Sequence, residues 1–435
     1  MLAAVEISNT YGLVIGASLV IIVSYFFQLF SKKTNIPSPL LLIAFGIILQ
    51  KLLQYIGIER IPYESLLLEI LGTIGLIFIV LEAALDLELT KDKWPTIWRS
   101  LLVALFGLLA TSFGIALFLH WMVIEDFLAA LVYSIPLSIM SSAIIIPSVG
   151  GLAKTQKEFM IYESTFSDIL GIMFFYLVLG NVEAESAGQI VGNVFSNIGI
   201  TLILAVVFGY GLVWVIQRLT GEVKLFMTIA ILVLIYAIEK IYHLSPLILI
   251  LAFGVMLNNY QLFWFRGLKK YIDEKKIESL HNEFHLLTLE SAFVIRTFFF
   301  VMFGLTISIA SILSWSVLFY SLVIVVIMYV ARLIFLWIFE CRSIFPLLYI
   351  APRGLITILL FFQIYSSHPE FISESFERGI LLQVVFISSI VMTISLIQNG
   401  WGIKEVERNK VSGDLQLDDS ENQLDAPNDD KSVIK

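Results

Sequence analysis

Residues 38–50 read SPLLLIAFGIILQ, and residues 245–259 read SPLILILAFGVMLNN, the same order of residues with one more apolar position. Each stretch belongs to an apolar segment of a size that suits a membrane-crossing helix. The two copies are the second and ninth such segments along the chain. Because these numbers differ by seven, an odd number, the copies run in opposite directions across the membrane. The match predicts an inverted repeat of six spans in each half, joined by one linking span. Ordinary membrane-helix composition is the alternative explanation of the match.

The composition supports a membrane protein. Of the 435 residues, 59% are hydrophobic and only 14% are charged, whereas a soluble domain carries roughly 25% charged residues. Backbone groups in lipid must be paired within their own segment, so the apolar runs are helices. The predicted fold class is therefore all-α, a polytopic membrane protein with about 13 transmembrane helices. The predicted spans are 11–30, 39–56, 66–89, 97–121, 126–150, 158–181, 193–217, 223–241, 245–260, 284–309, 313–340, 344–366 and 376–402.

Lysine and arginine set the predicted orientation, because cytoplasmic loops carry the excess of these residues. Of the 27 Lys and Arg residues, twenty follow odd-numbered spans and four follow even-numbered ones. The amino terminus is therefore expected outside and the carboxyl terminus in the cytoplasm, in a multi-pass protein of the cell (inner) membrane. The charged segment 266–285 is expected to lie along the cytoplasmic surface. Residues 403–435 are polar and acidic, which predicts a disordered cytoplasmic tail.

Two predicted spans are interrupted by residues that weaken helices. The fifth span contains Pro136 and Pro147 around Ser141 and Ser142, and the twelfth contains the sequence Ala-Pro-Arg-Gly at residues 351–354. Proline removes a helix hydrogen bond, and glycine costs about 1 kcal/mol in a helix interior. Corresponding interruptions in two halves point to an ion site, because broken helices offer free carbonyls and dipole ends. We therefore expect two discontinuous helices.

The sixth span carries a group of polar residues that we interpret as the ion site. Glu163, Ser164, Ser167 and Asp168 fall within one broad face of a helix, and Asp168 lies too deep to reach water with its short side chain. Desolvation there disfavours the charged carboxylate, so that a proton can compete with a cation. Arg353 can neutralise only one of the two carboxylates. Arg296 and Arg332 are also available, but Glu82, Asp86 and Glu290 compete for them.

These motifs resemble the monovalent cation/proton antiporter superfamily, and most closely its bacterial electroneutral sodium/proton exchangers. The sequence LEAALDLEL from Leu81 is similar to that branch's Phe-Glu-Ala-Ala-Leu-Asn-Leu stretch, with Glu82 at its acidic position. Residues 163–168 resemble the Glu-Ser-x-x-Asn-Asp signature, and residues 352–354 resemble the Leu-Arg-Gly-Ala segment. Phe300 to Leu305 resembles the glycine-containing end of the tenth span. The resemblance covers about residues 11–402.

The resemblance implies a function and a set of site residues. The protein would be a secondary active antiporter that exchanges a monovalent cation for protons by alternating access, and would serve pH homeostasis. Asp168 would bind both the cation and the proton, with Ser164, Ser167, Ser141, Ser142 and Glu82 as further cation-site residues. Glu163 and Arg353 would form a structural ion pair. No cofactor is implied beyond the transported cation, which is sodium or alternatively potassium or lithium, and the proton.

The resemblance also implies an architecture. Residues 1–402 would form one transmembrane antiporter domain, with core helices at about 97–181 and 313–402 and interface helices at about 11–89 and 193–309. The implied partners are membrane lipid and a second copy of the chain in a homodimer, with no nucleic acid.

Two departures from the family pattern bear on selectivity. Ser167 replaces the asparagine before the critical aspartate, which leaves one titrating carboxylate there and favours one-for-one, electroneutral exchange. Ser141 and Ser142 stand where a Thr-Asp pair is usual, so sodium preference is open and a potassium preference remains an alternative.

Other function classes would require different arrangements of these residues. A symporter or uniporter of a small organic anion is the alternative, in which Arg353 would face a substrate carboxylate. An intramembrane enzyme would need a catalytic pair, but the five histidines all fall near span ends or in loops. No catalytic residue is predicted. The lone Cys341 excludes a disulfide framework within the chain and gives no metal-binding spacing.

Overall fold

A computed structural model of the chain describes residues 10–34, 36–55, 64–180, 200, 203–215, 224–241, 246–263, 274–306, 314–340, 344–373 and 375–398. All regular structure in these ranges is helical. The helices are α1 (Thr10–Thr34), α2 (Ser38–Tyr55), α3 (Glu64–Asp86), η1 (Lys91–Lys93), α4 (Trp94–Met122), α5 (Phe127–Ser138), α6 (Ser142–Ser148), α7 (Lys154–Leu179), α9 (Lys224–Ile241), α10 (Pro246–Asn258), α11 (Tyr260–Phe263), α12 (Glu274–Thr306), α14 (Trp315–Phe339), α15 (Ile344–Tyr349), α16 (Leu355–Ser367), η3 (Pro369–Phe371) and α17 (Arg378–Gln398). A further short apolar helix covers Ile203–Val215.

The helices have the lengths and compositions of membrane spans. Within the described residues, eight are long and apolar enough to cross a bilayer, and four shorter apolar helices accompany them. The prediction of an all-α polytopic membrane protein is confirmed, while the total of thirteen spans stays a prediction. The predicted tail, residues 403–435, lies outside the described residues.

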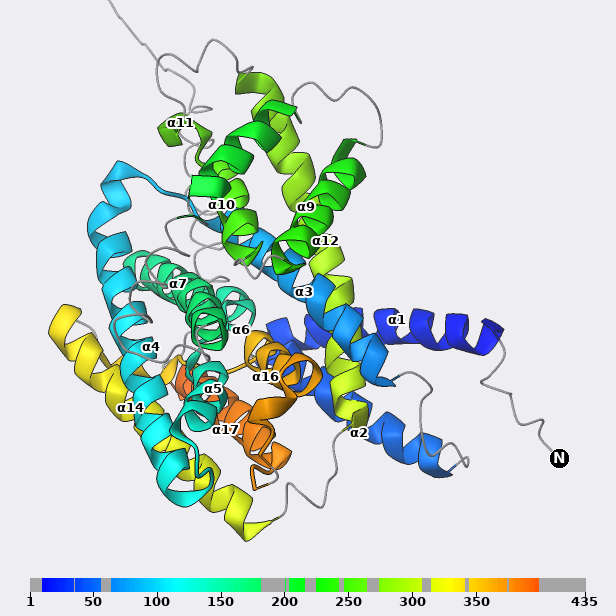
Figure 1. Ribbon diagram of the computed structural model, residues 1–435, viewed down its shortest axis with the longest axis vertical. Coiled ribbons are helices and arrows are strands. Elements are labelled where there is room, and N and C mark those ends of the chain that lie inside the picture. The colour runs from blue at the N-terminus through cyan, green and yellow to red at the C-terminus, as the bar shows by residue number, and fades with distance from the viewer. Residues whose placement is uncertain are drawn as a thin grey trace, which may run out of the picture.

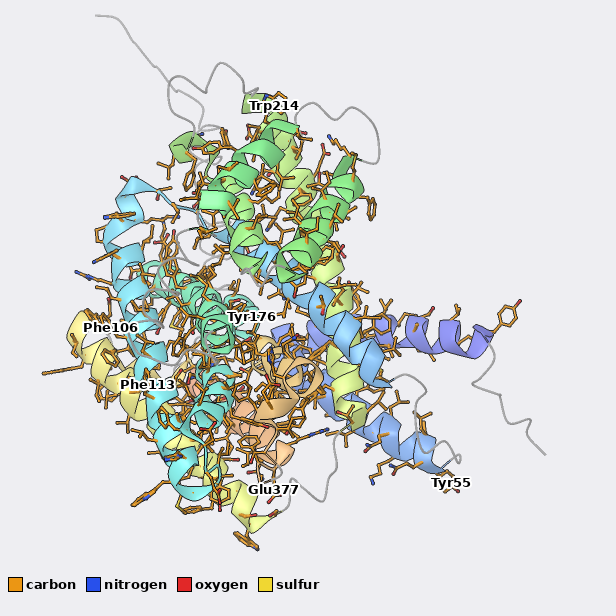
Figure 2. The ribbon with its side chains drawn as sticks, viewed as in Figure 1. Tyr55, Phe106, Phe113, Tyr176, Trp214 and Glu377 are labelled. Atoms are coloured by element: carbon orange, nitrogen blue, oxygen red, sulfur yellow. The ribbon has the colours of Figure 1, made fainter. Side chains whose placement is uncertain are left out.

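The surface of the bundle is apolar, as expected for helices in lipid. On α1, which extends sideways from the body of the molecule (Figure 1), Val14, Leu19 and Phe26 are all exposed. Figure 2 shows Tyr55 at the far tip of α2, where it points away from the bundle, and Tyr176 of α7 near its centre. Apolar side chains on the outside suit a hydrocarbon solvent, while the interior holds both a hydrophobic core and the buried polar residues of the site.

The two predicted interruptions are present. The first lies between α5 and α6, where Ile139 and Ser141 have extended backbone angles. The second lies between α15 and α16, over residues 350–354. Pro136 lies inside α5 rather than at the gap. The proline therefore marks the correct span, and the break itself follows one turn later.

The repeated sequence places its glycines at two close helix crossings. A Cβ on Gly46 of α2 would lie 2.9 Å from the Cα of Gly304 on α12. Gly254, the matching residue of α10, packs against Ala84 of α3 so closely that its Cβ would contact the alanine methyl at 2.5 Å. An inverted repeat that pairs α2 with α10 and α3 with α12 would produce these two related crossings. The contacts support the repeat, which itself stays a prediction.

The charged segment 266–285, expected along the cytoplasmic surface, is described from Glu274 onward, and its position relative to the membrane stays a prediction. Its described part, from Glu274 onward, is continuous with α12. Ile277, Leu280 and Phe284 are buried at helical spacing, and the ring of Phe284 packs edge-on against Phe253 of α10 at 6.0 Å. This apolar stripe fixes the amino-terminal part of α12 against the bundle, and the charged residues lie between its members.

Candidate ion-binding site

The two interrupted helices meet in the middle of the molecule, where α5, α6 and α16 lie together (Figure 1). The backbone N–H of Ser141 donates to the carbonyl of Pro352 at 3.0 Å, so the gaps are joined by their main chains. Gly354 makes this approach possible, because a Cβ there would lie 2.5 Å from Ser141 Oγ and 2.9 Å from Ile144 Cδ1. Each gap leaves backbone N–H and C=O groups without hydrogen bonds inside a helix, and the Ser141–Pro352 bond pairs one such group from each gap.

Asp168 of α7 lies beside this crossing. One carboxylate oxygen, Oδ2, accepts a hydrogen bond from the backbone N–H of Ser142 at 3.1 Å. The residue is only 3% exposed, and its other oxygen, Oδ1, has no hydrogen-bond partner in the structure. Gly171 brings α7 this close, since a Cβ there would overlap Ile139. A buried carboxylate oxygen without a partner is costly and needs a ligand or a proton.

The predicted serines of α7 have separate structural roles. Ser167 Oγ accepts a hydrogen bond from the backbone N–H of Met140 at 2.9 Å, which ties α7 to the first gap. Ser164 Oγ donates to the carbonyl of Ile161 on its own helix at 3.2 Å. Ser141 and Ser142 are buried at the gap itself. The structure thus brings together Asp168, Ser167, Ser141 and Ser142, while the Ser164 hydroxyl is turned back onto its own helix.

The predicted pairing of Glu163 with Arg353 is wrong. Glu163 binds Arg332 of α14 in a two-pronged ion pair, with Nη1–Oε1 and Nη2–Oε2 distances of 2.5 and 3.0 Å. Arg332 also donates to the carbonyl of Leu347 at the end of α15, through Nε at 3.1 Å and Nη2 at 2.8 Å. Glu163 precedes Asp168 by five residues, which turns the two carboxylates about 140° apart on α7. The two therefore face different neighbours, and α14 supplies the arginine on the Glu163 side.

The Arg353 side chain donates hydrogen bonds to backbone carbonyls at the crossing of the two interrupted helices. Its Nε donates to the carbonyl of Leu137 at 2.7 Å and its Nη1 to that of Ala351 at 3.2 Å, while its backbone N–H donates to Ser388 Oγ at 3.1 Å. No carboxylate of the described residues lies within ion-pair distance of it. The guanidinium thus caps the carboxyl end of α5, where helix carbonyls carry partial negative charge.

Glu82 stands apart from Asp168 in an ion pair of its own. Its Oε1 lies 3.2 Å from Nη2 of Arg296 on α12. Both side chains line a cavity of about 320 Å³, which Ser142 also lines. Further lining residues lie near helix ends, namely Ser31 and Ser38 of α1 and α2, Asp86 of α3 and Ser148 of α6. The cavity thus connects the predicted acidic position with the residue that holds Asp168.

The end of α3 is held from two sides. Asn259, after α10, donates to the carbonyl of Leu87 at 2.7 Å and accepts from the N–H of Leu89 at 2.6 Å. From α7, the hydroxyl of Tyr162 donates to the carbonyl of Glu88 at 2.6 Å. In the short helix η1 that follows, the pKa of Lys93 is raised, first by its hydrogen bond to Glu88. These contacts fix α3 and α7 relative to each other near the site.

Arg332, Met140 and Asn259 were not predicted as part of the site or its frame. Arg332 had a signal in the sequence, an arginine inside an apolar span, which made it one of three available partners. The roles of Met140 and Asn259 rest on their backbone and amide hydrogen bonds, for which the residue types give no signal.

An all-helical apolar chain with two interrupted helices crossing beside a buried carboxylate is a membrane transporter of the broken-helix kind. The chain belongs to the sodium/hydrogen exchanger family, whose transmembrane model matches residues 17–399. This family consists of transporters rather than enzymes. Comparison with curated protein sequences finds no significant match.

Solved structures of similar fold include the sodium proton antiporter MjNhaP1 from Methanocaldococcus jannaschii. Its structure at pH 8 has a TM-score of 0.64 and 18% sequence identity, and the match covers 88% of this chain and 95% of that chain. A structure of the same antiporter from electron microscopy has a TM-score of 0.63 and 19% identity, with 90% and 95% covered. At such low identity the likeness confirms the fold of the chain and nothing finer.

Proposed function

We propose that this chain exchanges one monovalent cation for one proton across the membrane, with both ions binding in turn at Asp168. One observation carries the proposal. Oδ1 of Asp168 is buried without a partner beside the crossing of the two interrupted helices. A group in that position gains more from binding a proton or a small cation than an oxygen already bonded to protein would.

The positive charges near the site support a cation rather than an organic anion. A transporter of organic anions would direct Arg353 towards the substrate. Here the guanidinium of Arg353 is bound to the carbonyls of Leu137 and Ala351, and that of Arg332 to Glu163 and Leu347. Both arginines are therefore engaged with the protein, whereas Oδ1 of the Asp168 carboxylate has no partner among the described residues. A symporter or uniporter of an organic anion would need the Arg353 guanidinium to face the substrate, and here it binds backbone carbonyls instead.

The cavity next to Glu82 supplies the access path in this proposal. Its lining runs from the ends of α1, α3 and α6 to Ser142, and the charge count places those ends in the cytoplasm. The structure then corresponds to the inward-facing state of an alternating-access cycle. In that cycle a core containing α4–α7 and α14–α17 moves against an interface domain of the remaining helices. The protein would work as a homodimer in the cell membrane, with the amino terminus outside.

Sodium is the first candidate for the transported cation, with lithium and potassium as further candidates. Sodium and lithium are small hard cations that prefer oxygen ligands of the kind gathered here. The site supplies one carboxylate, the hydroxyls of Ser141 and Ser142, and no second carboxylate at the gap. A single exchanging carboxylate supports one-for-one exchange.

The test is transport by purified protein in proteoliposomes. The wild type should release internal protons when sodium, lithium or potassium chloride is added outside, as followed with an internal pH dye. Asp168→Asn should remove exchange while the protein stays folded, because a neutral amide cannot alternate between proton and cation.

Asp92→Asn, which changes an exposed carboxylate in the short helix η1, is the matched control and should transport like the wild type. Exchange by Asp168→Asn above about a tenth of the control rate would show that another group carries the ions.

A further inference from the structure

A second unpaired oxygen lies one helical turn from the unpaired oxygen of Asp168. Thr165 is 1% exposed, and its hydroxyl Oγ1 has no hydrogen-bond partner among the described residues. Residues three apart on a helix are neighbours on its surface, with Cβ atoms about 5–6 Å apart. Two buried oxygens without partners therefore share one strip of α7.

An unpaired threonine hydroxyl is unusual in a buried helix. Such hydroxyls commonly bond a carbonyl three or four residues earlier on the same helix, as those of Ser134, Ser138 and Thr228 do here. The neighbouring Ser164 also takes this arrangement, by bonding the carbonyl of Ile161. The Thr165 hydroxyl does not follow it, so its oxygen is left for another group. Among the described residues, four other buried serine and threonine hydroxyls lack partners, and none of these lies on α7: Ser112, Thr288, Thr357 and Ser389.

The contacts of α7 show which way Thr165 faces. Tyr162, Thr165 and Asp168 form one row along the helix at intervals of three residues. At one end of the row Tyr162 contacts the segment after α3, through the Glu88 carbonyl. At the other end Asp168 contacts the start of α6, through Ser142. Thr165 lies between these two contacts. The elements on either side, α3 and α6, also supply Glu82, Asp86 and Ser142 to the cavity.

We propose that the Thr165 hydroxyl is a ligand of the transported cation and determines its affinity, acting together with Oδ1 of Asp168. This inference rests on the proposed function of Asp168. A neutral hydroxyl supplies a hard oxygen to a dehydrated alkali cation without adding charge, so it strengthens cation binding and leaves the one-for-one balance unchanged. A proton needs a single oxygen, so the hydroxyl favours the cation over the proton.

The experiment replaces Thr165 by valine, which keeps the shape and removes the oxygen, and by serine, which keeps the oxygen. Sodium-driven proton release is measured in proteoliposomes over a range of NaCl concentrations. We expect Thr165→Val to raise the half-saturating sodium concentration about tenfold, with a maximal rate near that of the wild type. Thr165→Ser should stay within about threefold of the wild type. Thr288→Val, which removes an unpaired buried hydroxyl from α12, is the matched control and should leave both values unchanged.

The outcomes separate this proposal from the proposed function. If Asp168→Asn is inactive while Thr165→Val needs less than about fivefold more sodium, the ligand role of Thr165 is overturned and that of Asp168 stands. If Asp168→Asn transports, the proposed function itself is wrong. If Thr165→Val does not fold, Thr165→Cys is compared with Thr165→Ser for sodium and for thallium, a softer ion that sulfur binds better. The cysteine variant should shift preference towards thallium, and an unchanged preference overturns the proposal.

Discussion

The ion pair between Glu163 and Arg332 gives the sharpest test of the structure, because Arg353 is a competing partner on the same crossing. Both members of the pair are deeply buried, with side chains 2% and 7% exposed, and they meet in a two-pronged arrangement. Removing one member of such a pair strands the other and typically costs about 3–5 kcal/mol. Arg332 also holds the carbonyl of Leu347, so its loss should lie at the upper end of this range.

The two arginines are distinguished by a double-mutant cycle. Glu163→Gln is combined with Arg332→Gln in one cycle and with Arg353→Gln in another, and the free energy of unfolding is measured in mixed micelles. Residues in direct contact show coupling of about 0.5–3 kcal/mol, and the geometry predicts the upper part of that range for Arg332. For Arg353, whose guanidinium binds carbonyls, we expect coupling below about 0.5 kcal/mol. A larger coupling of Glu163 to Arg353 than to Arg332 would refute the assignment.

Three further results are expected. Gly354→Ala should abolish transport or folding, because the added Cβ would overlap Ser141 at the crossing. The control Gly16→Ala on α1 meets no atom within 4 Å, so expression and transport should match the wild type in the same assays. Deleting residues 411–435 should leave the rate of exchange in vesicles unchanged, because this acidic composition cannot build a core; a loss of exchange at normal expression would contradict this. In proteoliposomes with opposed sodium and pH gradients, flux should vanish when the two ratios match at every clamped potential, whereas a reversal point that moves with voltage would exclude one-for-one exchange.

Much of the fold and the main site residue could be predicted from the sequence. Apolar length specifies a membrane helix directly, because lipid leaves no other way to pair the backbone. Pro136 and the Pro352–Gly354 segment identified the two interrupted spans for the same local reason. Asp168 stood out because a carboxylate deep in an apolar helix needs a function or a partner. Each of these inferences depends on one segment and its solvent.

The partners of the buried charges could not be predicted in this way. Whether Glu163 meets Arg332 or Arg353 depends on how α7 is rotated against α14 and α16, which is decided by packing over the whole bundle. The same holds for Glu82, whose partner Arg296 lies 214 residues away. The unpaired state of the Thr165 hydroxyl was also hidden, because a threonine in a helix normally bonds its own backbone. The local sequence identifies the buried charged residues, but the packing of the whole fold determines which of them form ion pairs.

The charges around the crossing bear on the stoichiometry. Glu163 and Arg332 form an ion pair with no net charge. If Asp168 is ionised when the site is ready to bind, its charge and that of Arg353 also sum to zero. One proton or one monovalent cation then adds the same single charge, and both loaded forms carry an equal charge through the membrane. In the proposed cycle their exchange would therefore move no net charge, whereas each uncompensated charge would respond to voltage by about 2.3 kcal/mol per 100 mV. Two carboxylates line the cavity: Asp86 contacts His285 of α12. The other is Glu82, and it is paired with Arg296. Glu82 would carry a second proton only by leaving Arg296 unpaired. A voltage-dependent reversal point would therefore indicate that Glu82 separates from Arg296 during the cycle. In that case Glu82→Gln should make the reversal point independent of voltage.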